Sequence, residues 1–258
     1  NKLLVFVPLI LLILVSFDLL RFAKKWQEFD PKSLAYPHVA VEEKFKQISS
    51  FERVFGNLGS EASVYYRLPS IEGYDAVYNQ RYGQFIASVK NGDLENSPRS
   101  VVSFPKQGLH SRKALDLLGA KYFVHKLSDG RSPWVFPFWN YPDEFKLIYD
   151  DGIYQIYENS ESFPRAFLAG DYKVQADPQE ILSTMFLEDL DLRKTVVLEK
   201  DPKIKLDIKD GSARVEKYLP NEVTINTKAD GSSLLFLSDS YYPGWKAFDN
   251  GKNTDIII

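Results

Sequence analysis

Residues 234–248 read LLFLSDSYYPGWKAF and lie near the C-terminal end of the sequence. The apolar run 234–237 is short enough for a buried strand, and the Pro243-Gly244 pair that follows is typical of a turn. Further on, Asn250-Gly251 favours the positive φ of a hairpin turn, and residues 256–258 form another β-branched run. The pattern predicts an antiparallel β-domain in which the sequence stops within a strand.

The composition of the 258 residues excludes several classes of protein. The apolar content of 44% is enough for hydrophobic cores in one large or two ordinary domains. The net charge is −3 and the two signs are interspersed, so no nucleic-acid partner is predicted. Cysteine is absent, which excludes thiolate catalysis, cysteine-based zinc sites and disulfides.

Aromatic residues make up 14% of the chain, which is a high share. Aromatic-rich β cores are the simpler interpretation, because Phe and Tyr are large apolar side chains that fill sheet interfaces. A surface that faces sugars is the alternative interpretation, and composition alone leaves both open.

The N-terminal segment differs in kind from the rest. Residues 3–23 are almost all apolar, with Asp18 near the end of the run, and this length matches the hydrocarbon core of a bilayer. A secretory signal peptide is the main alternative, but no small-x-small cleavage site precedes Lys24-Lys25-Trp26. We therefore predict a transmembrane helix over residues 1–25 in a chain cut from a longer membrane protein, with Trp26 at the headgroup level.

The charges that flank this helix bear on its orientation in the membrane. Arg21, Lys24 and Lys25 follow the apolar run, whereas Lys2 alone precedes it. The positive-inside rule would then place the rest of the chain in the cytoplasm. With two residues before the helix, this comparison is one-sided.

Periodicity divides the remaining residues into two predicted domains. Residues 26–170 mix helices and strands, and residues 171–258 read as a β-sandwich that lacks its last strands, so the fold class is α+β. Helices are predicted near residues 41–48, 82–89, 111–118 and after Asp177, and a hairpin over 145–157. Strands are predicted at 121–125, 196–198, 204–208, 213–218 and 223–225. The tyrosine-rich stretch 63–82 is predicted to be a structured loop.

The sequence contains few signs of catalysis. His38, His110 and His125 are too scattered for a metal cluster, and neither a glycine-rich phosphate cradle nor a Gly-x-Ser-x-Gly elbow occurs. We predict no catalytic residue, no metal site and no cofactor. Asp239 lies just before the Tyr-Tyr-Pro-Gly turn, where a carboxylate can bind a ligand or cap the backbone amides of the turn, and capping is the simpler interpretation.

Four ordered stretches carry a resemblance to a known family. They are Gly73-Tyr74-Asp75 with Arg81-Tyr82, then 117–122, then 157–159 with Pro164-Arg165-Ala166, and finally 237–246 followed by an Asn-Gly-Lys turn. Together with the preceding membrane helix, this set resembles the C-terminal extracytoplasmic region of the bacterial YfhO family of multi-spanning membrane proteins. The resemblance covers nearly the whole chain.

The resemblance implies a membrane-embedded glycosyltransferase of the GT-C type. Such an enzyme takes a sugar from a polyprenyl-phosphate carrier and adds it to a cell-envelope glycopolymer such as teichoic acid. Its catalytic acids lie in an early extracytoplasmic loop, outside this chain. The implied location is the bacterial cytoplasmic membrane, with the lipid bilayer as a partner and the soluble part extracytoplasmic. The alternative is a single-pass, membrane-anchored envelope binding protein without catalytic activity.

The resemblance also implies candidate site residues. Tyr74, Arg81, Tyr241 and Trp245 are candidates for substrate contact. The remaining motif positions, whose roles can be structural, are Gly73, Asp75, Tyr82, Pro164, Arg165, Asp239, Tyr242, Pro243 and Gly244.

Overall fold

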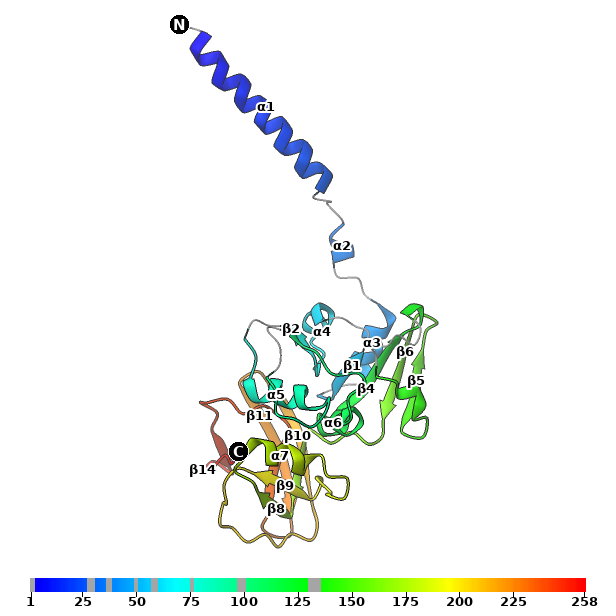
Figure 1. Cartoon of the computed structure of the whole chain (residues 1–258), viewed down its shortest axis with the longest axis vertical. Helices are drawn as coiled ribbons and strands as arrows, with labels where there is room; N and C mark the ends of the chain where they lie inside the picture. The colour runs from blue at the N-terminus through cyan, green and yellow to red at the C-terminus, as the bar shows by residue number, and fades with distance from the viewer. Residues whose placement is uncertain are drawn as a thin grey trace. The chain divides into compact units, whose positions relative to one another are not determined.

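A computed structural model describes residues 3–26, 31–35, 39–48, 51–56, 60–74, 77–96, 101–129 and 136–258. Its internal contacts divide the chain into two units, residues 1–39 and 40–258, which are labelled by element in Figure 1.

The first unit is dominated by one long apolar helix. Helix α1 spans Leu3–Trp26, and its 24 residues give a length of roughly 36 Å. Within residues 6–26 a stretch of 18 residues has a mean hydropathy of 2.2, so this helix is long and apolar enough to cross a membrane. It carries Lys24 and Lys25 in its last turn, and a short helix, α2 (Lys32–Ala35), follows. The predicted apolar helix at this end of the chain is confirmed.

The second unit contains a four-stranded mixed sheet. Its order is β1 (Arg53–Gly56), β4 (Ala120–Lys126), β6 (Tyr154–Asn159) and β5 (Phe145–Asp150). Strands β1 and β4 are parallel, and the other pairs are antiparallel. The predicted β5–β6 hairpin is confirmed: Gly152 adopts a φ of +81° in the turn, and the Asp151 carboxylate accepts bonds from the next backbone amides.

Helices cover the two faces of this sheet. Tyr122 and Phe123 are neighbours in β4 and therefore point to opposite faces. Tyr122 contacts Phe45 of α3 (Ala40–Ile48), whereas Phe123 belongs to a core with Leu115 of α6 (Ser111–Leu117). That core also receives α5 (Gln80–Ser88). Smaller elements nearby are α4 (Ser60–Tyr66), the pair β2 (Gly73–Tyr74) and β3 (Val101–Val102), and the 3₁₀ turns η1 (Leu127–Asp129) and η2 (Phe138–Asn140).

The later strands form separate pairs. Strand β7 (Ala166–Ala169) is antiparallel to β12 (Leu234–Leu237), and β8 (Asp171–Val174) is parallel to β9 (Thr195–Leu198). Helix α7 (Pro178–Met185) connects β8 and β9, and the predicted Asp177 cap accepts two backbone N–H bonds. Two hairpins follow: β10 (Gly211–Leu219) with β11 (Glu222–Ala229), and β13 (Ala247–Asp249) with β14 (Lys252–Thr254).

The α+β class is confirmed, but the β-sandwich is not, because no sheet in the described part of the chain closes. Residues 204–208 and 256–258 were predicted strands and lie outside any strand. Within 204–208 the Asp207 carboxylate accepts a hydrogen bond from Ser232 N. The backbone N–H groups of Asp207 and Ile208 both donate to Ser232 O, so the backbone bonds of this segment go to one residue and form no ladder. The stretch 63–82, predicted to be a loop, contains the end of α4. Val64 and Tyr65 of this helix are exposed, so the sequence shows no apolar stripe at helical spacing. The domain boundary at residue 170 stays a prediction.

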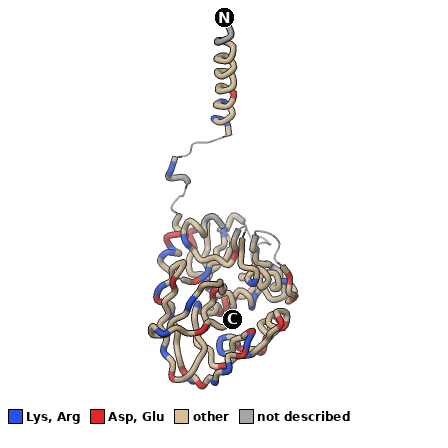
Figure 2. The backbone as a smooth tube through the Cα atoms, turned by 90° about the vertical axis from the view of Figure 1, so that its left-hand side faces the viewer, with Lys and Arg blue, Asp and Glu red and all other residues tan. Residues whose placement is uncertain are grey.

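Charge is distributed evenly over the second unit. Figure 2 shows Lys and Arg interspersed with Asp and Glu along the backbone of residues 40–258.

Candidate functional site

A pocket of about 430 Å³ lies beside α6 in the second unit. Residues from α6, Glu144 just before β5 and the segment 188–193 line it. Its charged side chains are Arg112, Lys113, Asp116, Glu144, Glu188, Asp189, Asp191 and Arg193, and its apolar ones include Leu109 and Phe163. The volume is within the range of small-molecule sites, but the lining is mostly charged, whereas such sites are usually lined by apolar side chains with a few polar groups.

The amphipathic pattern of α6 aims its charged residues at this pocket. Ala114 and Leu115 are fully buried on the core side of the helix. The buried Ser111 fixes the start of the helix, because its hydroxyl donates to Pro105 O at 2.7 Å and accepts from Gly108 N at 2.9 Å. Arg112 and Asp116 are four residues apart and therefore lie one above the other on the pocket side.

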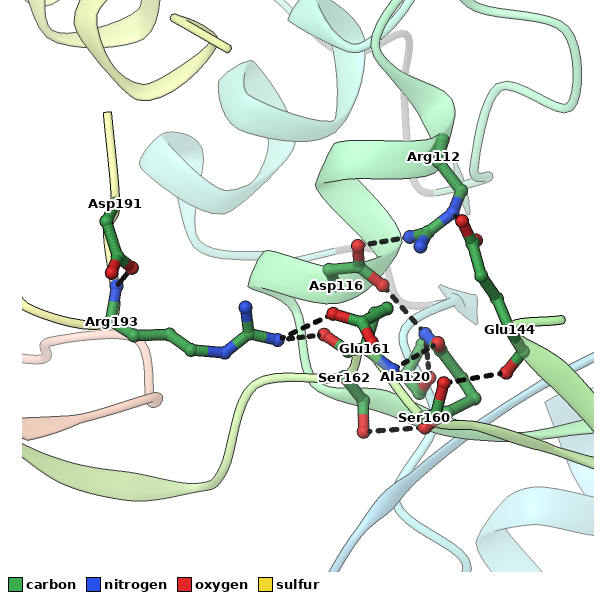
Figure 3. Close-up of polar contacts among 10 residues, drawn as sticks. Arg112, Asp116, Ala120, Glu144, Ser160, Glu161, Ser162, Asp191 and Arg193 are labelled. Atoms are coloured by element: carbon green, nitrogen blue, oxygen red, sulfur yellow. Dashed lines mark hydrogen bonds and ion pairs between the residues drawn. The ribbon is translucent and has the colours of Figure 1, made fainter. Parts of the chain in front are cut away.

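Arg112 joins two carboxylates at one wall of the pocket. Its Nε donates to Glu144 and its Nη1 donates to Asp116, as Figure 3 shows. Burial acts to lower the pKa of Arg112, but the hydrogen bonds and charges of Glu144 and Asp116 outweigh it, so the pKa lies above its usual value. Arg112 is therefore a fixed cation that orients both acids.

Asp116 is the least exposed acid of the wall. Its Oδ1 accepts a bond of 2.8 Å from the fully buried Asn159, which also donates to Ala120 O at 3.2 Å. Burial raises the pKa of the Asp116 carboxyl, against the opposing effects of Asn159 and Arg112. A carboxyl with a raised pKa in a pocket is a mark of functional sites.

The other cations of the pocket are also engaged. Arg193 lies with its guanidinium carbon 4.4 Å from the Phe163 ring centroid and donates to Glu161 O at 2.6 Å. Lys113 donates to Leu187 O. By contrast, Glu188 and Asp189 are exposed and make no hydrogen bond or ion pair with the residues that the structure describes. Five carboxylates face three cations, so the pocket favours hydroxyl or amine donors over anions.

The sequence-predicted residues Arg165 and Asp239 meet elsewhere. Because β7 and β12 are antiparallel with Ala166 opposite Leu237, the residues just beyond this pair lie together. Arg165 Nη2 donates to Asp239 Oδ1 at 3.0 Å, and the Tyr218 hydroxyl lies 3.0 Å from each carboxylate oxygen. Arg53, at the start of β1, is 3.3 Å from the same Oδ1. In the described part of the chain Asp239 thus binds side chains, and the expected capping of its turn is wrong.

The remaining predicted residues lie outside the α6 pocket, and one of them, Tyr82, is close enough to Arg53 to interact with its charge. Arg81 is 59% exposed and pairs with Glu199, and the Tyr241 carbonyl accepts from Asn79 at 3.0 Å. Tyr82 donates its hydroxyl to Ile71 O, and burial raises its pKa to about 12. Three predicted aromatic residues, Tyr241, Tyr242 and Trp245, are exposed. They surround the turn formed by Pro243 and Gly244, in which Gly244 adopts a φ of +109°.

Four further predicted positions remain, and the structure describes them to different extents. Gly73 pairs with Val102 in the β2–β3 ladder, and Pro164 directly precedes Arg165. The Tyr74 side chain and all of Asp75 lie outside the described residues. Among the residues that are described, no group of three or more His, Asp or Glu side chains is placed to hold a metal ion.

Sequence reasoning missed the pocket. Arg112 and Asp116 at a spacing of four on a predicted helix were a detectable signal, but Glu144 and the segment 188–193 join them only through the tertiary fold. Comparison with known proteins adds no neighbour: no family model matches this chain, and neither a curated protein nor a solved structure matches it.

Proposed function

We propose that this chain is a membrane-anchored glycan-binding protein of the bacterial cell envelope, and that the pocket beside α6 holds a neutral or amino sugar unit. The observation that carries the proposal is the pocket itself, in which oriented carboxylates face an open volume next to apolar Leu109 and Phe163. Sugar hydroxyls donate hydrogen bonds to carboxylates, while the ring's C–H faces pack on apolar side chains.

The state of the pocket's cations supports a sugar over an acidic ligand. Arg112, Lys113 and Arg193 already donate to protein acceptors. An incoming anion would have to displace those bonds and approach the surplus of carboxylates, whereas a hydroxyl group needs only a free acceptor. Glu188 and Asp189 at the exposed side of the pocket supply such acceptors.

The resemblance to the YfhO family supplies the wider proposal. In this wider proposal the chain is the acceptor-side portion of a multi-spanning transferase that uses a polyprenyl-phosphate-linked sugar. The pocket would hold the glycopolymer that receives the sugar. The single-pass binding protein remains the second candidate, and the same pocket serves it. Sequencing the gene outward separates them, since many upstream spans with an early acidic loop favour the transferase and a start codon just before Asn1 favours the second.

Binding is tested directly with the full chain in detergent micelles. By calorimetry, we expect a neutral hexose or N-acetylhexosamine oligosaccharide to bind and a uronic acid oligosaccharide not to bind. The double variant Glu188→Gln, Asp189→Asn should raise the dissociation constant about tenfold, because two charged acceptors are lost. The matched control, Glu216→Gln on the exposed face of β10, should leave it unchanged.

Two results would contradict the pocket proposal. One is the absence of binding for every neutral oligosaccharide while the chain remains folded. The other is an equal dissociation constant for the double variant and the control, because binding would then occur away from the pocket.

The extracytoplasmic side is a separate prediction. The chain has no cysteine, and Ser240 is exposed in the second unit. A Ser240→Cys variant should therefore react with a membrane-impermeant maleimide on intact cells, or on spheroplasts where an outer membrane is present. Asn1→Cys, on the other side of α1, should react only after lysis. The reverse pattern would place residues 40–258 in the cytoplasm, as the flanking charges suggest.

A further inference from the structure

Two arginines share a single carboxylate in the second unit. We call Arg53, Arg165, Tyr218 and Asp239 the arginine cluster. Arg53 Nη2 and Arg165 Nη2 lie 3.3 Å and 3.0 Å from the same Asp239 oxygen. The other Asp239 oxygen accepts from the Tyr218 hydroxyl. Among the described residues, the cluster therefore has two positive charges and one negative charge.

Arg165 is the most enclosed member and the least satisfied. Its side chain is 8% exposed and lies over the Tyr218 ring, with the guanidinium carbon 4.8 Å from the ring centroid. Two of its three guanidinium nitrogens, Nε and Nη1, have no hydrogen-bond partner in the described part of the chain. Buried polar groups are nearly always hydrogen-bonded, so these donors call for an acceptor that the described residues do not supply.

Arg53 brings a second positive charge to the single Asp239 carboxylate. Its side chain is 14% exposed, and its Nη1 donates to the backbone of Leu118 and to the Ser238 hydroxyl. Burial, and after it the charge of Arg165, lowers the pKa of Arg53 to about 10. The Arg53 guanidinium therefore stays protonated at neutral pH. A water molecule can accept hydrogen bonds here, but it cannot balance the extra charge.

We propose that the arginine cluster binds an oxyanion, a phosphoryl or carboxylate group, as its second counter-ion. Guanidinium groups prefer planar or tetrahedral oxyanions, whose oxygens accept several N–H bonds at once. The Asp239 side chain is 28% exposed, and the exposed Tyr241 and Tyr242 follow it closely in the chain, so Asp239 marks the solvent-facing side of the cluster. Asp239 holds the site together without ligand and competes with the incoming anion for the same donors. This site is independent of the sugar pocket.

The test compares anions at equal ionic strength on the full chain in detergent micelles. Inorganic phosphate at about ten times its dissociation constant should raise the midpoint of thermal unfolding by about 4 °C over chloride. In Asp239→Asn the competing carboxylate is gone, so phosphate should bind at least tenfold more tightly. Arg165→Lys keeps the charge but loses the fork of donors, and should bind at least tenfold more weakly. Arg214→Gln, an exposed control on β10, should behave like the original chain.

Equal midpoints in phosphate and chloride, for both the original chain and Asp239→Asn, would overturn the proposal. So would an unchanged phosphate response in Arg165→Lys. Three probes then identify the source of the oxyanion. Dimethyl phosphate binding as well as phosphate indicates a phosphodiester in a polymer, phosphate alone indicates a free phosphate or monoester, and acetate alone indicates a carboxylate. Each of these results supports the site, whether or not any oligosaccharide binds to the pocket.

Discussion

Replacing Phe123 by alanine is expected to lower the free energy of unfolding of the second unit by about 3–5 kcal/mol. Phe123 lies on β4 and is fully buried. Its ring centroid is 4.8 Å from that of Phe145, 5.6 Å from Phe55 and 5.9 Å from Phe138. Alanine would leave a cavity among rings that belong to β1, β5 and η2, and these cannot all collapse into it.

The measurement is urea unfolding of the full chain in detergent micelles, followed by tryptophan fluorescence. Phe248→Ala is the matched control, because that ring is 63% exposed and its removal should change the free energy by less than about 0.5 kcal/mol. Similar small losses for both variants would mean that the aromatic cluster does not form the core. The high aromatic content of the chain would then favour the alternative interpretation, a surface that faces sugars.

For most of the described aromatic residues near the sheet, the structure supports the first of the two interpretations drawn from composition. Phe55, Phe104, Phe123, Phe138 and Phe145 are buried in one cluster. The aromatic residues of the C-terminal turn differ, since Tyr242 is 69% exposed and Trp245 is 40% exposed. The sugar-facing interpretation therefore remains a prediction for that turn.

Local signals explain which elements were predictable. The β5–β6 hairpin depends on Asp151-Gly152, and the start of α7 depends on Asp177-Pro178, so neighbouring residues determine both. Pairing between distant strands has no such signal. Strands β7 and β12 pair across more than sixty residues, and an alternating pattern identifies a strand without naming its partner. The predicted sandwich is not confirmed for this reason: the strands exist in large part but form separate pairs.

The candidate sites show the same limit. Sequence motifs singled out Arg165 and Asp239, but as parts of two separate stretches, and the fold joins them. Arg53 and Tyr218 carried no signal, because an arginine before a strand and a tyrosine within one are ordinary surface residues in a sequence pattern. Their role depends on the packing of β1 and β10 against the end of the β7–β12 pair.

Replacing Asp239 by alanine is the second large effect that we expect, a loss of about 2–4 kcal/mol in a chloride buffer. Removing one partner of a buried ion pair leaves the other charge uncompensated, which costs about 3–5 kcal/mol when the pair is fully buried. The Asp239 side chain is 28% exposed, so its loss falls somewhat below that range, while Arg165 at 8% and Arg53 at 14% remain enclosed. Asp189→Ala, an exposed acid outside any described ion pair, is the control and should cost less than about 0.5 kcal/mol.

A double-mutant cycle with Arg165→Met distinguishes charge pairing from a local role in the turn. If Asp239 mainly neutralises Arg165, removing the arginine after the carboxylate is gone should cost less than removing it first, and can even restore stability. The expected coupling is above about 1 kcal/mol. A coupling near zero would show that Asp239 stabilises its own turn instead, and the two arginines would then have no shared counter-ion for an external oxyanion to supplement.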